Sequence, residues 1–221
     1  MKLILSGGGK GKQTREIDSL FFEFVKNKKV VFIPHSRKKK EFENSLNWIT
    51  ENLFLPFKHD KFEMWTKLDD KSIKDLYDVE GIIIGGGNTF RLLKELKDSK
   101  FIETLKKFIE DDKIVYGISA GAIILTKNII TANPIDENKV KLVNLDGMNL
   151  LDGMGIFCHY EEKYDKEISK IIEKENIEII GLQEGTGIYL ENFSKKIIGS
   201  NSAFLFSKRE NKKELKVGEE I

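Results

Sequence analysis

The sequence predicts an α/β fold: a doubly wound, mostly parallel sheet flanked by helices, with antiparallel hairpins toward the C-terminus. Short apolar runs alternate with longer amphipathic stretches along the first half of the chain. Several of these runs are β-branched throughout, which is typical of parallel strands buried on both faces. After about residue 127 the segments shorten and glycine becomes frequent, as in edge hairpins. No linker or repeat interrupts the 221 residues, so we predict one α/β domain over 1–221.

The individual elements follow from the spacing of apolar residues. In the first half, strands are expected at 3–5, 30–34, 61–65, 81–84 and 114–116. Between them, apolar residues recur at helical spacing over 17–25, 42–53, 92–96 and 102–109. In the second half we expect a helix over 164–174 and strands at 177–180, 187–190, 196–198 and 203–206. The charged segment 208–221 is either a terminal strand or a frayed tail.

The charge balance argues against a dedicated nucleic-acid binder. The chain has 37 Lys and Arg residues and 36 Asp and Glu residues, which leaves a formal net charge of +1. A nucleic-acid-binding domain usually has a basic surplus. The one dense basic run, 37–40, is interpreted as the solvated start of a helix, with an anion-binding patch as the alternative.

Cysteine content and hydropathy indicate a cytoplasmic location. Cys158 is the only cysteine, so an intramolecular disulfide is excluded, which fits a reducing compartment. The N-terminal segment lacks the apolar region and cleavage site of a signal peptide. No apolar run approaches the ~20 residues that are needed to cross a bilayer. We therefore expect neither a membrane nor a nucleic acid among the partners.

A candidate nucleophile lies in the glycine-bounded run 117–121, Gly-Ile-Ser-Ala-Gly. This run follows a predicted strand and precedes the apolar, helix-like segment 122–125. A G-x-S-x-G nucleophile elbow requires this strand–turn–helix context, because the serine must stand on a tight turn above the sheet. The amino end of the following helix would direct free N–H groups and a positive dipole at developing negative charge. We favour Ser119 as a nucleophile over an ordinary turn with a serine cap.

A second glycine-rich loop, 85–90, follows the strand expected at 81–84. Consecutive glycines allow the backbone to approach a ligand and direct N–H groups at it. The loop could supply half of an oxyanion hole, the Gly87 N–H acting with that of Ala120. It could also cradle a phosphate, although it lacks the P-loop and dinucleotide spacings, or form a tight turn in which Thr89 caps the next helix. The residues of this loop that could touch substrate are Gly86, Asn88 and Thr89.

A third glycine-rich loop, 6–12, follows the first predicted strand. It also lacks the P-loop spacing, and we interpret it as a flexible turn near the mouth of the site. Phosphate or nucleotide binding at 7–11 is the alternative.

A nucleophilic serine needs a base, and the chain has three histidines. His59 lies in a polar connection and is expected at the surface. His35 follows a strand end and is a competitor on the correct edge of the sheet. His159 directly follows the apolar run 155–158 and is favoured as the base. Cys158 would point away from His159 in a strand, so it is expected in the core.

The third group should be a carboxylate that orients the imidazole. Glu184 lies in a glycine-bounded turn immediately after a predicted strand, but the sequence alone leaves the choice open. The downstream candidates are Asp136, Asp146, Asp152, Glu161, Glu162 and Glu184.

Taken in order, the motifs at 85–93, 117–121, 159–160 and 181–185 resemble those of the dipeptidase E and cyanophycinase family of serine peptidases. The resemblance covers essentially the whole chain and implies a class I glutamine-amidotransferase-like fold, with serine where the amidotransferases have cysteine. It implies that Ser119 is the nucleophile, His159 the base and Glu184 the orienting carboxylate. The implied oxyanion donors are the backbone amides of Gly87 and Ala120.

The resemblance also implies a function, a serine exopeptidase that cleaves short peptides through an acyl-enzyme without a metal or cofactor. A homodimer is left open. The sequence departs from the aspartyl dipeptidase branch of this family at two places. Asn133 is followed by Pro134, with Asp136 two residues later, and segment 161–166 contains no arginine. Because lysine replaces a bidentate guanidinium poorly, we do not expect strict cleavage after aspartate. The alternatives are another small-molecule amidase or esterase, and a non-catalytic binding protein on the same fold.

Overall fold

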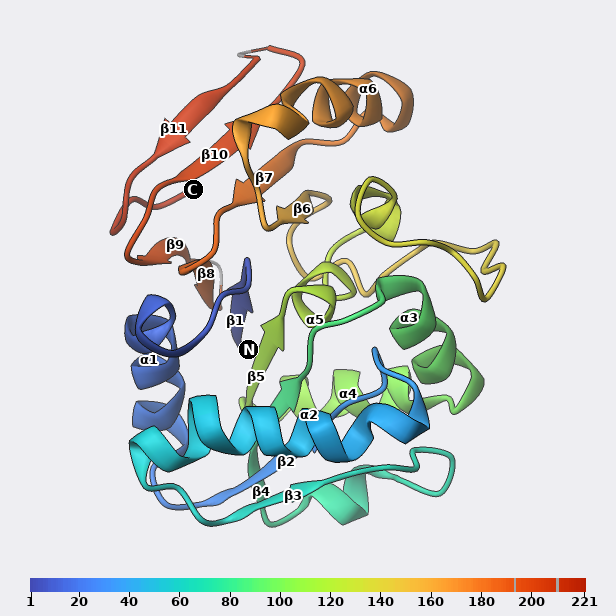
Figure 1. Ribbon diagram of the computed structural model, residues 1–221, viewed down its shortest axis with the longest axis vertical. Coiled ribbons are helices and arrows are strands. Elements are labelled where there is room, and N and C mark those ends of the chain that lie inside the picture. The colour runs from blue at the N-terminus through green and yellow to red at the C-terminus, as the bar shows by residue number, and fades with distance from the viewer. Residues whose placement is uncertain (193, 210) are drawn as a thin grey trace.

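Two sheets organise the chain (Figure 1). The computed structural model describes residues 1–192, 194–209 and 211–221. Within these residues, one sheet has seven strands in the order β3-β2-β4-β5-β1-β8-β9, and the other has four in the order β11-β10-β7-β6. No helix of this described part is long and apolar enough to cross a membrane.

The larger sheet has the predicted mostly parallel architecture. Strands β1 to β5 pair in parallel, β8 runs antiparallel beside β1, and β9 completes an antiparallel edge hairpin with β8. The strands of this sheet are β1 (Lys2–Ser6), β2 (Lys29–Ile33), β3 (Phe62–Met64), β4 (Val79–Ile84), β5 (Ile114–Ile118), β8 (Thr186–Glu191) and β9 (Ser194–Gly199).

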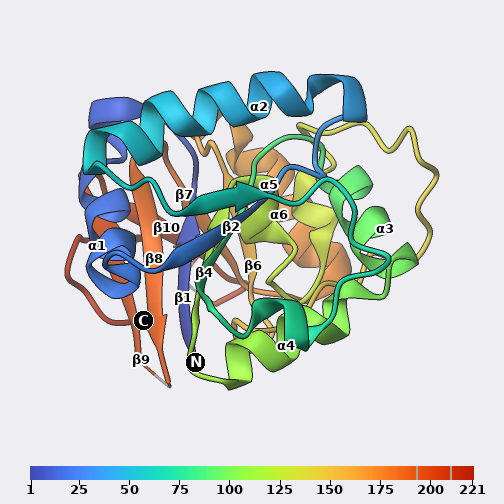
Figure 2. The same ribbon diagram turned by 90° about the horizontal axis from the view of Figure 1, so that it is seen from below.

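Helices cover both faces of this sheet, as a doubly wound fold requires. Helices α1 (Arg15–Val25) and α2 (Phe42–Ile49) pack on one face, and α3 (Thr89–Asp98), α4 (Phe101–Glu110) and α5 (Ala120–Ile123) pack on the other. Figure 2 shows α2 and α4 on opposite sides of β2 and β4. Successive strand residues alternate between the two apolar layers: Ile4 and Ile83 face α1 and α2, whereas Leu5 and Ile82 face the other layer. This double burial explains the continuous apolar runs.

The smaller sheet corrects one expectation. The segment 203–206 was expected to form an edge hairpin, but it leaves the larger sheet and pairs with β7 and β11. Its aromatic residues explain the position, because Phe204 and Phe206 pack on Tyr160, with ring centroids 5.1 and 5.5 Å away. The elements of this layer are β6 (Gly155–Cys158), α6 (Asp165–Glu175), β7 (Ile179–Leu182), β10 (Ala203–Phe206) and β11 (Lys213–Leu215).

The C-terminal segment forms a strand rather than a frayed tail. Of the charged segment 208–221, residue 210 lies outside the described residues, and β11 pairs antiparallel with β10. An isolated bridge between Lys196 and Glu220 fastens the end of the chain to β9.

A buried carboxyl group lies between α1 and the larger sheet. Asp18 is only 2% exposed, Tyr116 Oη donates to its Oδ1 at 2.8 Å, and Thr14 Oγ1 donates to its Oδ2 at 2.7 Å. Burial raises the pKa of Asp18 from 3.8 to about 6, although both hydrogen bonds oppose this. The pKa of Asp18 is thus higher in the folded than in the unfolded protein. The free energy of unfolding that the neutral carboxyl group supports at pH 4 is therefore lost as the pH rises through about 6.

We expect Asp18→Asn to remove this pH dependence. The variant cannot ionise, so its free energy of unfolding relative to the parent should rise by about 3 kcal/mol between pH 4 and pH 8. Urea unfolding at pH 4, 6 and 8 measures this difference, with the exposed Glu16→Gln on the same helix as the control. Parallel pH curves for the parent and Asp18→Asn would contradict the prediction.

Candidate active site

Ser119 stands on a strained turn at the carboxyl end of β5. Its backbone has φ 52° and ψ −109°, a conformation that residues with a side chain rarely adopt. Ser119 N donates to Ser6 O at 2.9 Å, which ties the turn to the end of β1. Gly121 allows the tight packing, because a Cβ at that position would lie 2.1 Å from Ile84 O. The strand–turn–helix context that the sequence predicted is therefore present.

The helix after this turn is a single turn, begins two residues before the expected segment 122–125 and is of the same length. Helix α5 contains four residues, Ala120–Ile123. A macrodipole sums over aligned peptide units, so one turn contributes little of it. Any stabilisation of negative charge at this position must come from individual N–H groups rather than from a helix dipole.

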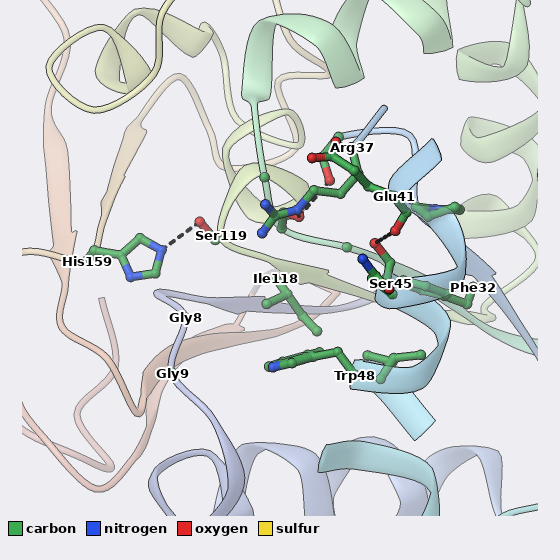
Figure 3. A pocket seen from close by; sticks show the side chains of 17 residues that line it. Gly8, Gly9, Phe32, Arg37, Glu41, Ser45, Trp48, Ile118, Ser119 and His159 are labelled. Atoms are coloured by element: carbon green, nitrogen blue, oxygen red, sulfur yellow. Dashed lines mark hydrogen bonds between the residues drawn. The ribbon is translucent and has the colours of Figure 1, made fainter. Parts of the chain in front are cut away.

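His159 and Glu184 lie in line with Ser119. Ser119 Oγ is 2.9 Å from His159 Nε2, and His159 Nδ1 is 3.1 Å from Glu184 Oε1. Figure 3 shows the imidazole directed at Ser119, with a dashed line joining the two side chains. An ionised carboxylate can only accept hydrogen bonds, so Nδ1 carries the proton in the neutral ring. Nε2 is then the acceptor, and Ser119 Oγ donates to it.

Three strand ends bring these residues together. Ser119 follows β5, His159 follows β6, and Glu184 lies two residues beyond β7. Because β6 and β7 are parallel, their carboxyl ends meet at one edge, and His159 N donates to Gly7 O at 3.0 Å beside β1. Glu184 is thus the sequence candidate that contacts the imidazole within the described residues.

The loop after β1 supports the imidazole directly. It was expected to be a flexible turn near the mouth, but a Cβ at Gly8 would lie 2.3 Å from His159 Cε1. Gly8 has φ 106°, and its carbonyl oxygen accepts from Gly185 N at 2.9 Å. The loop therefore contacts both the ring and the turn that carries Glu184. Sequence reasoning missed this role, and the signal was the glycine triplet itself.

We expect Gly8→Ala to displace the imidazole. The added methyl group cannot fit beside the ring, and a misplacement of about 1 Å reduces catalysis by about 100-fold. The measurement is kcat/KM on a cleaved peptide together with the melting temperature. Gly11→Ala is the control, because Gly11 also has a positive φ, 58°, but has nothing within 4 Å of its Cβ position. Equal losses in the two variants would assign the effect to backbone strain alone.

The glycine loop after β4 lies against the serine. A Cβ at Gly86 would be 3.3 Å from Ser119 Cβ, and Gly87 has φ 149°. Within the described residues, neither the Gly87 amide nor the Ala120 amide donates a hydrogen bond to another part of the chain. Gly87 lines both cavities beside Ser119, whereas Ala120, which directly follows Ser119 in the chain, is fully buried.

Asn88 and Thr89 use their side chains within the protein. Asn88 Oδ1 accepts from Arg91 N at 2.9 Å, so Asn88 caps α3, and the alternative in which Thr89 caps this helix is wrong. Thr89 is fully buried and donates through Oγ1 to Asp136 Oδ2 at 2.6 Å. Asp136 also accepts from Thr89 N at 2.8 Å, so its carboxylate is bound to the start of α3 rather than to His159. Asn88 and Thr89 both line a cavity next to Ser119.

Two cavities flank Ser119 and His159. The first, of about 400 Å³, extends along α2 past Ser45 and Trp48. The second, of about 430 Å³, extends toward the start of α3 and the segment 135–139. Arg37 and Gly87 line both cavities. In the described part of the chain, no group of three or more His, Cys, Asp or Glu side chains is arranged to hold a metal ion.

The other two histidines line neither cavity. His35 is buried, lines neither cavity, and has its pKa lowered to about 4 by burial. His59 is also buried, at 5% exposure, which corrects the expectation of a surface position. Its ring packs against Phe22 and Phe54, with centroids 5.3 and 5.8 Å away. Phe54 lies close to His59 in the sequence, but Phe22 comes from α1, and the local sequence does not contain that contact.

Cys158 lies in the core, as predicted. It is 1% exposed, and its thiol donates to Ser119 O at 3.6 Å. Burial raises the pKa of the Cys158 thiol far above its usual range, so it is not a reactive thiolate.

Comparisons with known proteins agree with this architecture. Residues 3–198 match the family described as Peptidase family S51. An uncharacterized peptidase of Listeria monocytogenes is 32% identical over 73% of this chain and 81% of its own length. Peptidase E of Nostoc sp. is 25% identical over 85% of this chain and 79% of its own, and the "Probable alpha-aspartyl dipeptidase" of Drosophila melanogaster is 24% identical over 84% and 78%.

Two solved structures share the fold. The "Putative Peptidase E Protein" from Listeria monocytogenes EGD-e matches with a TM-score of 0.71 and 25% identity, over 90% of this chain and 98% of that one. A peptidase from an acI-B1 Actinobacterium has a TM-score of 0.75 at 15% identity, over 100% and 96% of the two chains, and this likeness concerns the fold alone. Since the family match extends over most of the sequence, the chain belongs to peptidase family S51, the serine exopeptidase family of peptidase E.

Proposed function

We propose that this enzyme hydrolyses short peptides with Ser119 as nucleophile, His159 as general base and Glu184 as the carboxylate that orients the imidazole. The observation that carries the proposal is the chain of hydrogen-bond distances, 2.9 Å from Ser119 Oγ to His159 Nε2 and 3.1 Å from His159 Nδ1 to Glu184 Oε1. A serine hydroxyl becomes a strong nucleophile only when an adjacent base removes its proton. This arrangement supplies both the base and the group that fixes its tautomer.

Acylation proceeds in two steps. Ser119 Oγ attacks the scissile carbonyl carbon while its proton passes to His159 Nε2, which gives a tetrahedral oxyanion. The C–N bond then breaks, and Nε2–H protonates the leaving amine. Glu184 stabilises the imidazolium that exists between these steps. The first product leaves as an amine, and the remaining acyl group is an ester of Ser119.

Water completes the reaction. It attacks the acyl-enzyme carbonyl and gives its proton to Nε2, and the collapse of this second tetrahedral oxyanion returns the proton to Ser119 Oγ. We assign the stabilisation of both oxyanions to the amides of Gly87 and Ala120, which have no other partner in the described chain. One such donor typically contributes ~3–4 kcal/mol to the transition state. Gly86, which lies against Ser119, would border the bound peptide.

The curated relatives support a preference for dipeptides. One of them is named as a probable alpha-aspartyl dipeptidase and another as peptidase E. We propose short peptides, and dipeptides above all, as the substrates, and a cytoplasmic location consistent with the single buried cysteine. The formation of a homodimer stays a prediction.

Covalent labelling with a fluorophosphonate tests the nucleophile. The expected result is one phosphonate adduct, mapped by mass spectrometry to the peptide that contains Ser119, with much slower labelling in His159→Ala. A panel of dipeptides, tripeptides, amides and esters then identifies the cleaved bond. Absence of an adduct on the folded protein would contradict the proposed mechanism, and cleavage confined to esters would move the assignment to an esterase.

A further inference from the structure

Arg37 occupies the boundary between the two cavities. It lies on the connection from β2 to α2, in the basic run 37–40 that the sequence favoured as the solvated start of a helix, with an anion-binding patch as the alternative. Its side chain lines both cavities, and Figure 3 shows it extending across the first cavity toward Ser119. A charged group at this position is within reach of whatever Ser119 attacks.

The guanidinium is held against the glycine loop. Arg37 Nε donates to Gly86 O at 3.1 Å, and the adjacent Ser36 Oγ donates to the same oxygen at 2.7 Å. A Cβ at Gly87 would lie 2.9 Å from Arg37 Nε. Since Nε is used in this anchor, the two terminal amino groups of the fork are left to bind a ligand.

The carboxylates around Arg37 already have partners. Glu41 Oε2 accepts from Lys38 N at 2.8 Å, and Glu137 pairs with Lys139 at 2.9 Å. Asp136 is bound to the start of α3. Within the described chain, Arg37 itself forms no ion pair, although it is exposed at the site. An oriented guanidinium without a carboxylate partner fits a carboxylate that arrives with the substrate.

We infer that Arg37 is a specificity-determining residue that binds a carboxylate of the peptide substrate beside Ser119. The inference rests on the proposed function. If the scissile carbonyl oxygen points at the Gly87 and Ala120 amides, Arg37 lies within about one residue of it, and one extended residue spans about 3.5 Å. The carboxylate is therefore the C-terminal group of a dipeptide or the acidic side chain of a residue next to the scissile bond. Segment 161–166 contains no arginine, so the guanidinium comes from the loop that follows β2.

Matched substrates distinguish the two sources of the carboxylate. The first pair is a dipeptide and its C-terminal amide, and the second pair has Asp or Asn as the first residue. For whichever source is correct, the parent enzyme should prefer the charged member, and Arg37→Gln should lower kcat/KM for that member by about 10- to 100-fold, mainly through KM. The uncharged member should change by less than about 3-fold. Arg37→Lys should restore only a small part, because lysine lacks the bidentate fork.

A second measurement of the charge preference does not require turnover. If cleavage is too slow to measure, protection of Ser119 from the fluorophosphonate by each peptide gives the same comparison through binding. Arg15→Gln is the control, because Arg15 lies over Phe57 and lines none of the described cavities near Ser119. Normal labelling of Arg37→Gln in the absence of peptide separates this inference from the proposed nucleophile. Equal loss for charged and uncharged members, or no charge preference and no protection in the parent enzyme, would overturn it.

Discussion

Replacement of Ser119 by alanine is expected to reduce kcat/KM for the cleaved peptide by about 10⁵- to 10⁶-fold. The expected size follows from the loss of the whole covalent route, since a triad without its nucleophile retains only transition-state binding by the remaining site. Substrate binding should change little, because the substitution removes a single oxygen atom from one of the many residues that line the two cavities. The alanine variant should also form no fluorophosphonate adduct.

Control variants make this result specific to the proposed nucleophile. Ser169→Ala removes a serine on α6 whose hydroxyl donates to Asp165 O at 2.9 Å and has no other partner among the described residues, and it should leave activity unchanged. Cys158→Ala tests the neighbouring thiol, and it should lower stability through a small cavity without removing the adduct on Ser119. If Ser119→Ala kept more than about one hundredth of the parent activity, Ser119 would not be the nucleophile.

The strand–helix alternation made the larger sheet predictable. Parallel strands that are buried on both faces must be apolar at every position, and runs such as 81–84 therefore stand out from the amphipathic helices. The same topology explains why Ser119, at the end of β5, lies near the loop that follows β4. Such local patterns also identified the ends of β6 and β7 as positions for His159 and Glu184.

Tertiary contacts determined what the sequence could not show. The move of β10 into the second sheet depends on Tyr160, which lies more than forty residues earlier and covers its aromatic side chains. The buried position of His59 likewise depends on Phe22. The contacts of Gly8 with His159 and of Arg37 with Gly86 join different strand ends, and no spacing within one segment contains that information.

Replacement of Glu184 by glutamine is expected to reduce kcat/KM by about 10³-fold with the fold intact. A glutamine amide can donate to Nδ1 and favour the tautomer whose Nε2 carries the proton, and that tautomer cannot accept the proton of Ser119. Loss of the orienting carboxylate in a buried triad costs about 10⁴-fold. Glu184 is 49% exposed, so water can replace part of its interaction with the imidazolium, and the expected loss is correspondingly smaller.

Comparison with Asp136→Asn decides which carboxylate orients the base. Asp136 is bound to Thr89, and its removal should destabilise the start of α3 while lowering activity by less than about 10-fold. Glu161→Gln is the surface control, since the Glu161 side chain pairs with Lys163 at 2.7 Å and lines neither cavity. Glu184→Asp should recover part of the lost activity, because it restores the charge at a shorter reach. The opposite result would be a large loss of activity in Asp136→Asn and near-normal activity in Glu184→Gln. It would contradict the prediction and require the imidazole to change partners during the reaction. Slow fluorophosphonate labelling of Asp136→Asn would then identify Asp136 as the new partner.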